Sequence, residues 1–147
     1  TRQNVPQYAE TDEGAYKGGY ILRDAENGKP DVILMASGSE VELIYKAADL
    51  LQAEGISARL VSMPCLDLYD EQTDAYKESV LPGSVRARVA VEAGSACSWE
   101  RYVGLDGKTV CIDHYGSSAP AGILFKEFGF TAENVAKAAK ESILNVK

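Results

Sequence analysis

Few residues in this chain could do chemistry. Its single histidine is His114, and the carboxylate best placed to accept a proton is Glu92, which ends a predicted strand. Any acid–base scheme would have to use the His114 imidazole or a carboxylate such as Glu92, because these groups are the usual proton carriers. A lone loop histidine and a strand-end carboxylate more often make local hydrogen bonds. We therefore predict no catalytic residue in this chain.

Three familiar site signatures are also incomplete. Residues 116–120 come closest to a nucleophile elbow, but proline stands where its last glycine belongs. Gly38 stands alone where a dinucleotide-binding turn reads G-x-G-x-x-G, and no phosphate-binding G-x-x-x-x-G-K-[ST] loop occurs. Cys111 and His114 have a C-x-x-H spacing, but a tetrahedral metal site needs about three or four ligands and no second pair lies nearby. The sequence indicates no serine hydrolase, nucleotide site or metal site.

Composition excludes further classes of partner. The chain has 147 residues with 15 Lys and Arg against 22 Asp and Glu, a net charge of −7. Nucleic-acid binding depends on clustered cations, so we expect no nucleic-acid partner. Every apolar run is far shorter than the ~20 residues of a membrane helix, so we expect no membrane span. The odd set of cysteines, Cys65, Cys97 and Cys111, does not suit a disulfide framework and favours a reducing, cytoplasmic compartment.

The elements that must position these residues alternate between strand and helix. Apolar and β-branched runs predict strands at residues 19–24, 31–36, 56–63, 88–92 and 108–112. Helical spacing predicts helices at residues 40–54, 70–81, about 99–103, 120–129 and from 132 onward. This order predicts an α/β fold: an open three-layer α/β/α sandwich with a mostly parallel five-stranded sheet. The first strand lacks a crossover helix before the second and should form one antiparallel edge strand.

Two boundaries follow from local residue types. Residues 1–17 are polar and aperiodic, which is typical of a linker, and the domain should occupy residues 18–147. Ser39 is placed to cap the helix over residues 40–54, and Gly55 is placed to end it.

An open α/β sheet binds ligands beyond the carboxyl ends of its strands. Ser39, Glu92 and His114 each end or follow a predicted parallel strand. We therefore expect a weak candidate crevice for a small ligand at these residues. This expectation rests on analogy with other folds of this type.

Several ordered blocks carry a family resemblance. In chain order they are residues 1–7 (TRQNVPQ), 17–20 (KGGY), 36–43 (ASGSEVEL), 61–64 (VSMP), 91–94 (VEAG), 102–105 (YVGL), 115–120 (YGSSAP) and 125–130 (FKEFGF). Together they closely resemble the C-terminal third of transketolases. The resemblance covers nearly the whole chain, and residues 1–17 then read as the end of a preceding domain and an interdomain linker.

The resemblance implies a function for the intact enzyme. Transketolases are homodimers of the pentose phosphate pathway that move a two-carbon ketol unit between sugar phosphates, using thiamine diphosphate and a divalent metal. The family's cofactor-binding domains lie upstream and have no counterpart here, so the fragment alone should bind no cofactor, should not catalyse, and should support domain and subunit packing. Arg2, in the TRQN block, corresponds to the arginine that holds the substrate phosphate, a task suited to a guanidinium fork.

Two alternatives stay open. The chain could be a stand-alone regulatory module that binds a small ligand near Ser39, Glu92 and His114. It could also be the equivalent domain of another thiamine-diphosphate enzyme, such as the β subunit of a 2-oxo-acid dehydrogenase or deoxyxylulose-phosphate synthase. The TRQN and SGSEVEL blocks favour transketolase over these relatives.

Overall fold

A computed structural model describes residues 6–8 and 12–147 of the chain. Within them five strands form one sheet in the order β1-β3-β2-β4-β5. The strands are β1 (Tyr20–Arg23), β2 (Val32–Ala36), β3 (Ala58–Ser62), β4 (Arg88–Glu92) and β5 (Lys108–Cys111). The edge strand β1 runs antiparallel to β3, and the other neighbouring pairs are parallel. The predicted fold class is confirmed.

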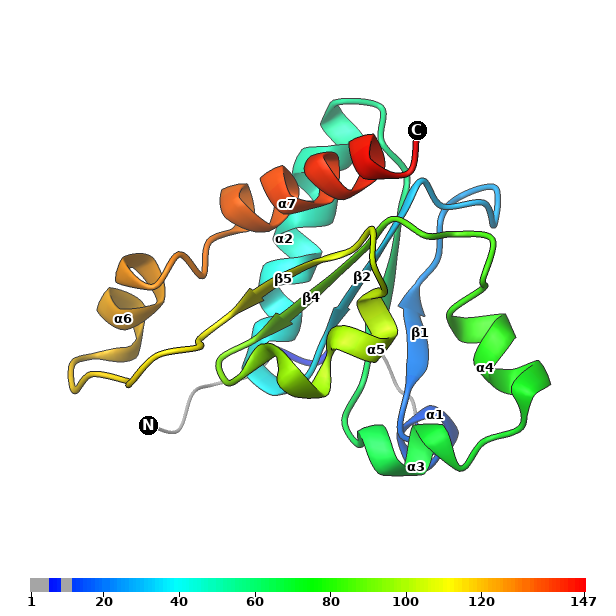
Figure 1. Cartoon of the computed structure of the whole chain (residues 1–147), viewed down its shortest axis with the longest axis horizontal. Coiled ribbons are helices and arrows are strands. Elements are labelled where there is room, and N and C mark those ends of the chain that lie inside the picture. Colours follow the sequence, from blue (N-terminus) through cyan, green and yellow to red (C-terminus); the bar gives the residue numbers. More distant parts are fainter. Residues whose placement is uncertain (1–5, 9–11) are drawn as a thin grey trace.

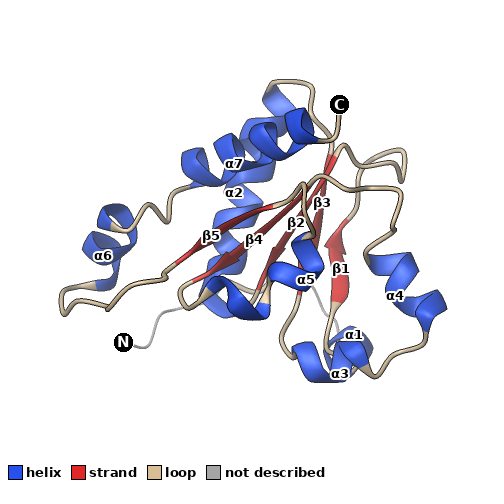
Figure 2. Cartoon of the chain, in the orientation of Figure 1, coloured by secondary structure: helices blue, strands red, loops and turns tan. Residues whose placement is uncertain are grey.

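Helices cover both faces of the sheet (Figure 1). One face carries α2 (Val41–Ala53) and α7 (Ala132–Asn145), which pack on each other. The other face carries α3 (Leu66–Asp70), α4 (Asp74–Val80) and α5 (Glu100–Val103). Figure 2 shows the strands as a layer between these helices. The apolar run of β2 explains this sandwich, because all five of its residues are buried.

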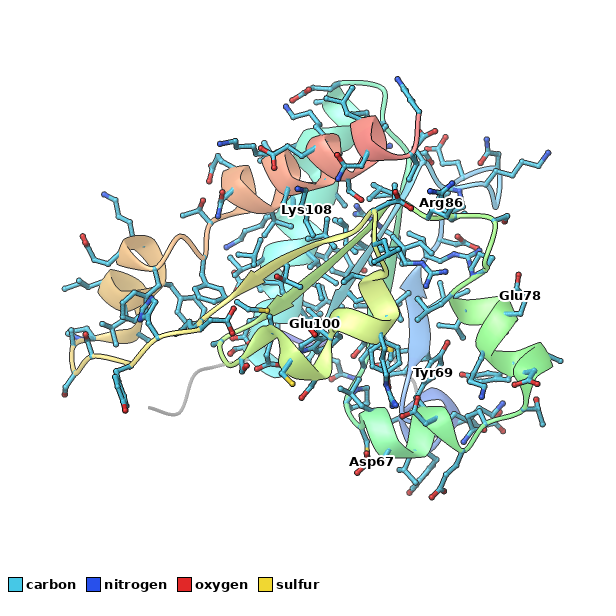
Figure 3. All side chains as sticks on the ribbon, viewed as in Figure 1. Asp67, Tyr69, Glu78, Arg86, Glu100 and Lys108 are labelled. Carbon is cyan, nitrogen blue, oxygen red and sulfur yellow. The ribbon has the colours of Figure 1, made fainter. Side chains whose placement is uncertain are left out.

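Alternate side chains of β2 enter two separate cores. Leu34 faces the core that α2 and α7 close, while Ile33 and Met35 face the core on the opposite side. Tyr69, labelled in Figure 3, is only 2% exposed and lies in this second core. The period-two alternation of a strand thus divides one continuous apolar run between two layers.

Local elements differ from the sequence prediction at two places. The helix predicted over residues 70–81 is α4, which begins only at Asp74 because Thr73 caps it by accepting a hydrogen bond from the Tyr76 backbone N–H at 3.2 Å; α3, which ends at Asp70, was not predicted. Within the segment predicted as a linker, α1 (Asp12–Tyr16) forms a short helix. Every strand begins and ends within about two residues of its predicted bounds.

The cap predicted at Ser39 is wrong. A 3-10 turn, η1 (Gly38–Glu40), precedes α2, so the residue at the helix N-cap is Glu40. The Ser39 hydroxyl instead donates a hydrogen bond to the Glu40 carboxylate at 2.6 Å. The predicted end of α2 is confirmed, since Gly55 follows it with a φ of 79°.

Two further helical elements lie next to the ends of β4 and β5. A second 3-10 turn, η2 (Ala96–Ser98), precedes α5, and α6 (Ala121–Glu127) lies beyond the end of β5, at the left of Figure 1. None of the side chains of α6 is fully buried. Among the described residues, no helix combines the length and the apolar character needed to cross a membrane.

Candidate functional site

The carboxyl ends of β2 and β4 meet where the sheet changes its winding direction. From β2 the chain crosses to β3 on one side, and from β4 it crosses to β5 on the other. Ligands in open α/β sheets bind at such a switch point. The residues that gather here are Ser37, Ser39, Glu40 and Glu92.

Two serine hydroxyls each bind one of the two carboxylates. Ser37 Oγ donates to Glu92 Oε2 at 2.8 Å, joining the loop after β2 to the last residue of β4. Ser39 Oγ donates to Glu40 Oε1 at 2.6 Å. The Glu40 residue is only 4% exposed, which is unusual for a carboxylate. The structure therefore brings Ser39 and Glu92 to one place and adds a buried acid between them.

The surroundings of Glu40 favour its protonated form. Burial raises the pKa of Glu40, and the negative charge of Glu92 raises it further. Hydrogen bonds from the Ser39 hydroxyl and from the backbone N–H groups of Glu40 and Ala93 act in the opposite direction without cancelling the rise. Glu40 thus holds its proton more firmly than an exposed glutamate does.

Sequence reasoning missed Glu40. The sequence pattern places it in the first turn of a helix, where a carboxylate is ordinary. Glu92 and the backbone N–H of Ala93, more than fifty residues away along the chain, are among the groups that act on its carboxylate. The available signal was the SGSE stretch itself, which places a polar loop and an acid directly after the central strand.

His114 lies in a different environment. Its Nδ1 is 2.9 Å from the carbonyl oxygen of Tyr115, and its ring meets the edge of Phe128 with centroids 5.0 Å apart. A pocket of about 390 Å³ lined by Ser95, Ile112, Asp113, His114 and Tyr115 surrounds it. Among the described contacts, His114 has none with Ser39 or Glu92. The predicted crevice is therefore two neighbourhoods rather than one.

The predicted phosphate-binding residue, Arg2, lies outside the described residues. The nearest described segment, residues 6–8, reaches the domain through Tyr8. Its ring stacks on Tyr45 of α2 with centroids 4.1 Å apart and planes inclined by 13°. Residues 6–8 thus contact α2, the helix that also begins at the switch point.

The sequence matches the family described as "Transketolase-like TK C-terminal domain" over residues 18–131. Chloroplastic transketolase of Solanum tuberosum is 56% identical over 143 residues, which cover 96% of this chain and 19% of that protein. Transketolase 1 of Vibrio vulnificus strain YJ016 is 54% identical over 144 residues, which cover 96% of this chain and 22% of that protein. The chain spans about a fifth of the length of these curated relatives.

Solved structures of transketolases also superpose on this chain. Transketolase from Leishmania mexicana superposes with a TM-score of 0.88 at 40% identity, covering 97% of this chain and 20% of that one. A Pichia stipitis transketolase in complex with sedoheptulose 7-phosphate gives 0.85 at 36% identity, with the same coverage. A split-gene transketolase described as an inactive β4 tetramer gives 0.72 at 25% identity, covering 99% of this chain and 49% of that one.

Proposed function

The chain belongs to the transketolase C-terminal-domain family, and on that premise we propose that it is the C-terminal portion of a transketolase. The intact enzyme would transfer a two-carbon ketol unit between ketose and aldose phosphates. The observation that carries this proposal is the identity of 54–56% with transketolases over nearly the whole chain. The sugar phosphate bound by the Pichia stipitis relative supports the substrate class.

We assign the cofactors, thiamine diphosphate and a divalent metal, to parts of the enzyme outside this chain. The described residues contain no group of three or more His, Cys, Asp or Glu side chains that could hold a metal ion. The switch point also presents two carboxylates, which would repel a diphosphate. The residues described here do not fit the cofactor, and we derive no step of the reaction through it.

The direct contribution that we propose for this chain is a substrate contact from Arg2. A guanidinium makes paired, charge-assisted hydrogen bonds with a phosphate and stays charged at any working pH. Holding the phosphate end of a sugar fixes the far end of the molecule, and that binding energy orients the reacting end. Domain packing and subunit packing are the remaining roles that we propose.

The partners would be the upstream domains of a transketolase and a second subunit. The chain's coverage of only a fifth of its relatives supports the first part of this proposal. The split-gene relative that assembles as an inactive tetramer supports the view that this region does not act alone. The three free cysteines support a reducing compartment, for which we propose the cytoplasm.

The alternative of a ligand-binding regulatory module has weaker support. The acidic pair at the switch point disfavours anionic ligands, and His114 lies apart from it. Calorimetry with neutral sugars, sugar phosphates and nucleotides would test this alternative. Saturable binding that Glu92→Gln abolishes would establish a crevice ligand and would count against a purely structural role.

A chimeric enzyme tests the main proposal. This chain replaces the matching segment of Vibrio vulnificus transketolase 1, and turnover of xylulose 5-phosphate with ribose 5-phosphate is measured. We expect turnover by the chimera and none by the 147-residue chain with added thiamine diphosphate and magnesium. Turnover by the chain alone would refute the assignment of the cofactors. A well-folded but inactive chimera would refute the assignment of this region to a transketolase.

A further inference from the structure

The loop between β1 and β2 contains an asparagine that is followed by glycine. Asn27, Gly28 and Lys29 are all exposed in this loop, which projects at the upper right of Figure 1. Each of the other three asparagines of the chain is followed by valine. A β-branched side chain crowds the backbone nitrogen of its own residue, whereas glycine has no Cβ. Asn27 is therefore the asparagine whose following backbone nitrogen is least hindered.

The turn holds the side chain of Asn27 in one orientation. Asn27 Oδ1 accepts a hydrogen bond from the Lys29 backbone N–H at 2.9 Å, the bond that defines an Asx turn. A donor on this oxygen polarises the side-chain carbonyl. It also stabilises the negative charge that develops on Oδ1 when a nucleophile attacks Cγ, as the donors of an oxyanion hole do. The turn thus activates the Asn27 amide toward attack.

We propose that Asn27 is a site of spontaneous deamidation in the folded domain, with the backbone nitrogen of Gly28 as the nucleophile. A bond forms between this nitrogen and Asn27 Cγ, the Cγ–Nδ2 bond breaks, and Nδ2 leaves as ammonia with the proton given up by the Gly28 nitrogen. Water then opens the cyclic imide at either carbonyl and leaves aspartate or isoaspartate. A short covalent tether already holds the two reacting groups together, so the step needs no enzyme.

The products would alter a loop that also holds a buried ion pair. Both add one negative charge, and isoaspartate also inserts one extra atom into the backbone between β1 and β2. Asp24, three residues before Asn27, is the partner of the buried Arg59 side chain. The modification therefore falls next to a contact that fixes this end of the sheet.

One contact of the nucleophile opposes the reaction. The Gly28 N–H donates to the Ala25 carbonyl oxygen at 2.8 Å, and this bond must open before the nitrogen can lose its proton. Apart from the neighbouring residues, nothing lies within 4 Å of a Cβ built on Gly28, so no packed side chain keeps the turn closed. Exposed loops open locally at far lower cost than the whole fold. We therefore expect the native state to react.

Asn134 provides an internal reference within the same chain. It lies in the first turn of α7, where its Nδ2 donates to the Gly129 carbonyl oxygen at 2.9 Å. The nitrogen that would have to attack it belongs to Val135, which is fully buried and donates to the Thr131 carbonyl oxygen at 3.1 Å. Attack at Asn134 would require the start of α7 to unwind, so this amide should persist while that of Asn27 is lost.

Peptide mapping by mass spectrometry tests the proposal. The 147-residue chain is kept at mildly alkaline pH without denaturant, and the conversion of each asparagine to aspartate and isoaspartate is followed over time. We expect Asn27 to react at least about tenfold faster than Asn134, the low end of what one oxyanion donor supplies. Isoaspartate should accompany aspartate, because direct hydrolysis gives aspartate alone. Equal rates at the two asparagines, or loss of the Asn27 amide only in urea, would overturn the proposal.

Variants of the two following residues test the roles of the donor and of the nucleophile. Lys29→Pro removes the N–H that binds Asn27 Oδ1 and should slow the reaction about tenfold, whereas Lys29→Ala keeps this N–H and should react as the parent does. Gly28→Ala crowds the nucleophile and should also slow the reaction, without depending on the fold of the proline variant. An unchanged rate in Gly28→Ala would show that the Gly28 nitrogen does not attack. Equal rates in the two Lys29 variants would show that the turn does not activate the amide.

Discussion

Ser37 donates a 2.8 Å hydrogen bond to Glu92 and so ties the loop after β2 to the end of β4. These two strands are neighbours at the centre of the sheet, where the direction of winding reverses. The bond holds the Glu92 carboxylate toward the loop that carries Glu40. The switch point of this sheet is therefore occupied by its own side chains.

Removal of this bond should cost a modest amount of stability. Ser37→Ala deletes the donor and should lower the free energy of unfolding by about 1 kcal/mol, the usual net contribution of such a bond. Glu92→Gln keeps an acceptor oxygen and should cost less. Urea denaturation of both single variants and of the double variant gives their coupling energy. A coupling energy near zero would show that the two side chains do not interact in solution.

The stability of the domain should depend on pH through Glu40. The pKa of Glu40 is raised in the folded state by burial and by Glu92, so the unfolded chain releases this proton at lower pH. Between the unfolded and the folded pKa the unfolded state therefore binds fewer protons, and stability falls as pH rises. Glu40→Gln removes this loss, so its stability relative to the parent should increase from pH 4 toward pH 8.

Ser39→Ala should change the pH dependence in the opposite direction from Glu40→Gln. It removes a hydrogen bond that lowers the pKa of Glu40, so that pKa should rise and stability should keep falling up to a higher pH than in the parent. Thermal unfolding followed by circular dichroism at several pH values measures both variants. A difference between Glu40→Gln and the parent that stays constant over this range would contradict the prediction.

The sequence pattern predicts the sheet well because the buried residues of its strands are also those that favour extended backbone. The apolar run of residues 31–36 indicated a strand covered on both faces, and Leu34 and Met35 are fully buried on opposite sides. The helix predicted over residues 70–81 starts too early, because the hydroxyl of Thr73 caps α4 and sets its first residue at Asp74.

The candidate site was harder to predict because it depends on the order of strands. Glu92 and His114 are both near strand ends in the sequence, yet β4 is central and β5 is an edge strand. His114 consequently lies beside Phe128 after α6, while Glu92 faces the loop after β2. The environment of Glu40 has no local signature, since it includes Glu92 and Ala93, which are distant in sequence.

Gly18 should be the least replaceable glycine at the start of the domain. Its φ is 78°, and a Cβ there would lie 2.3 Å from the Cys65 carbonyl oxygen and 2.5 Å from the Tyr69 nitrogen. Both atoms belong to the backbone and cannot rotate away. Gly18→Ala should therefore lower the free energy of unfolding by more than about 3 kcal/mol, combining positive-φ strain with a steric clash.

Gly28 provides the matched control for Gly18. Its φ is 67°, but nothing lies within 4 Å of a Cβ built there. Gly28→Ala should cost only about 1–2 kcal/mol, which is the price of positive φ for an L residue. Chemical denaturation of both variants measures the difference. Equal losses of unfolding free energy in the two variants would mean that the atoms around Gly18 move to admit the Cβ. The positive φ alone would then account for the loss in each variant.

The ion pair of Arg59 and Asp24 should make the domain sensitive to acid. Arg59 Nε and Nη2 bond to the two Asp24 carboxylate oxygens at 2.8 and 3.0 Å, and Nη1 reaches the carbonyl oxygens of Ser79 and Val80. The side chain of Arg59 is only 8% exposed, whereas that of Asp24 is 39% exposed. Asp24→Asn leaves a buried cation without its counter-ion and should cost about 2 kcal/mol, less than for a fully buried pair.

The pH dependence of Asp24→Asn should identify the cause of that loss. Burial alone would raise the pKa of Asp24, but the hydrogen bonds from Arg59 and the Ala25 N–H and the charge of Arg59 outweigh it and lower the pKa. The pair therefore stabilises the fold above the unfolded pKa, and this contribution is lost as pH falls through the folded pKa. The free energy of unfolding of Asp24→Asn should thus differ most from that of the parent near pH 7 and become equal to it in acid.

Glu54→Gln, which breaks an exposed ion pair with Lys140, is the control and should cost less than about 1 kcal/mol. A loss for Asp24→Asn that persists unchanged at pH 2 would place its origin in packing rather than in charge.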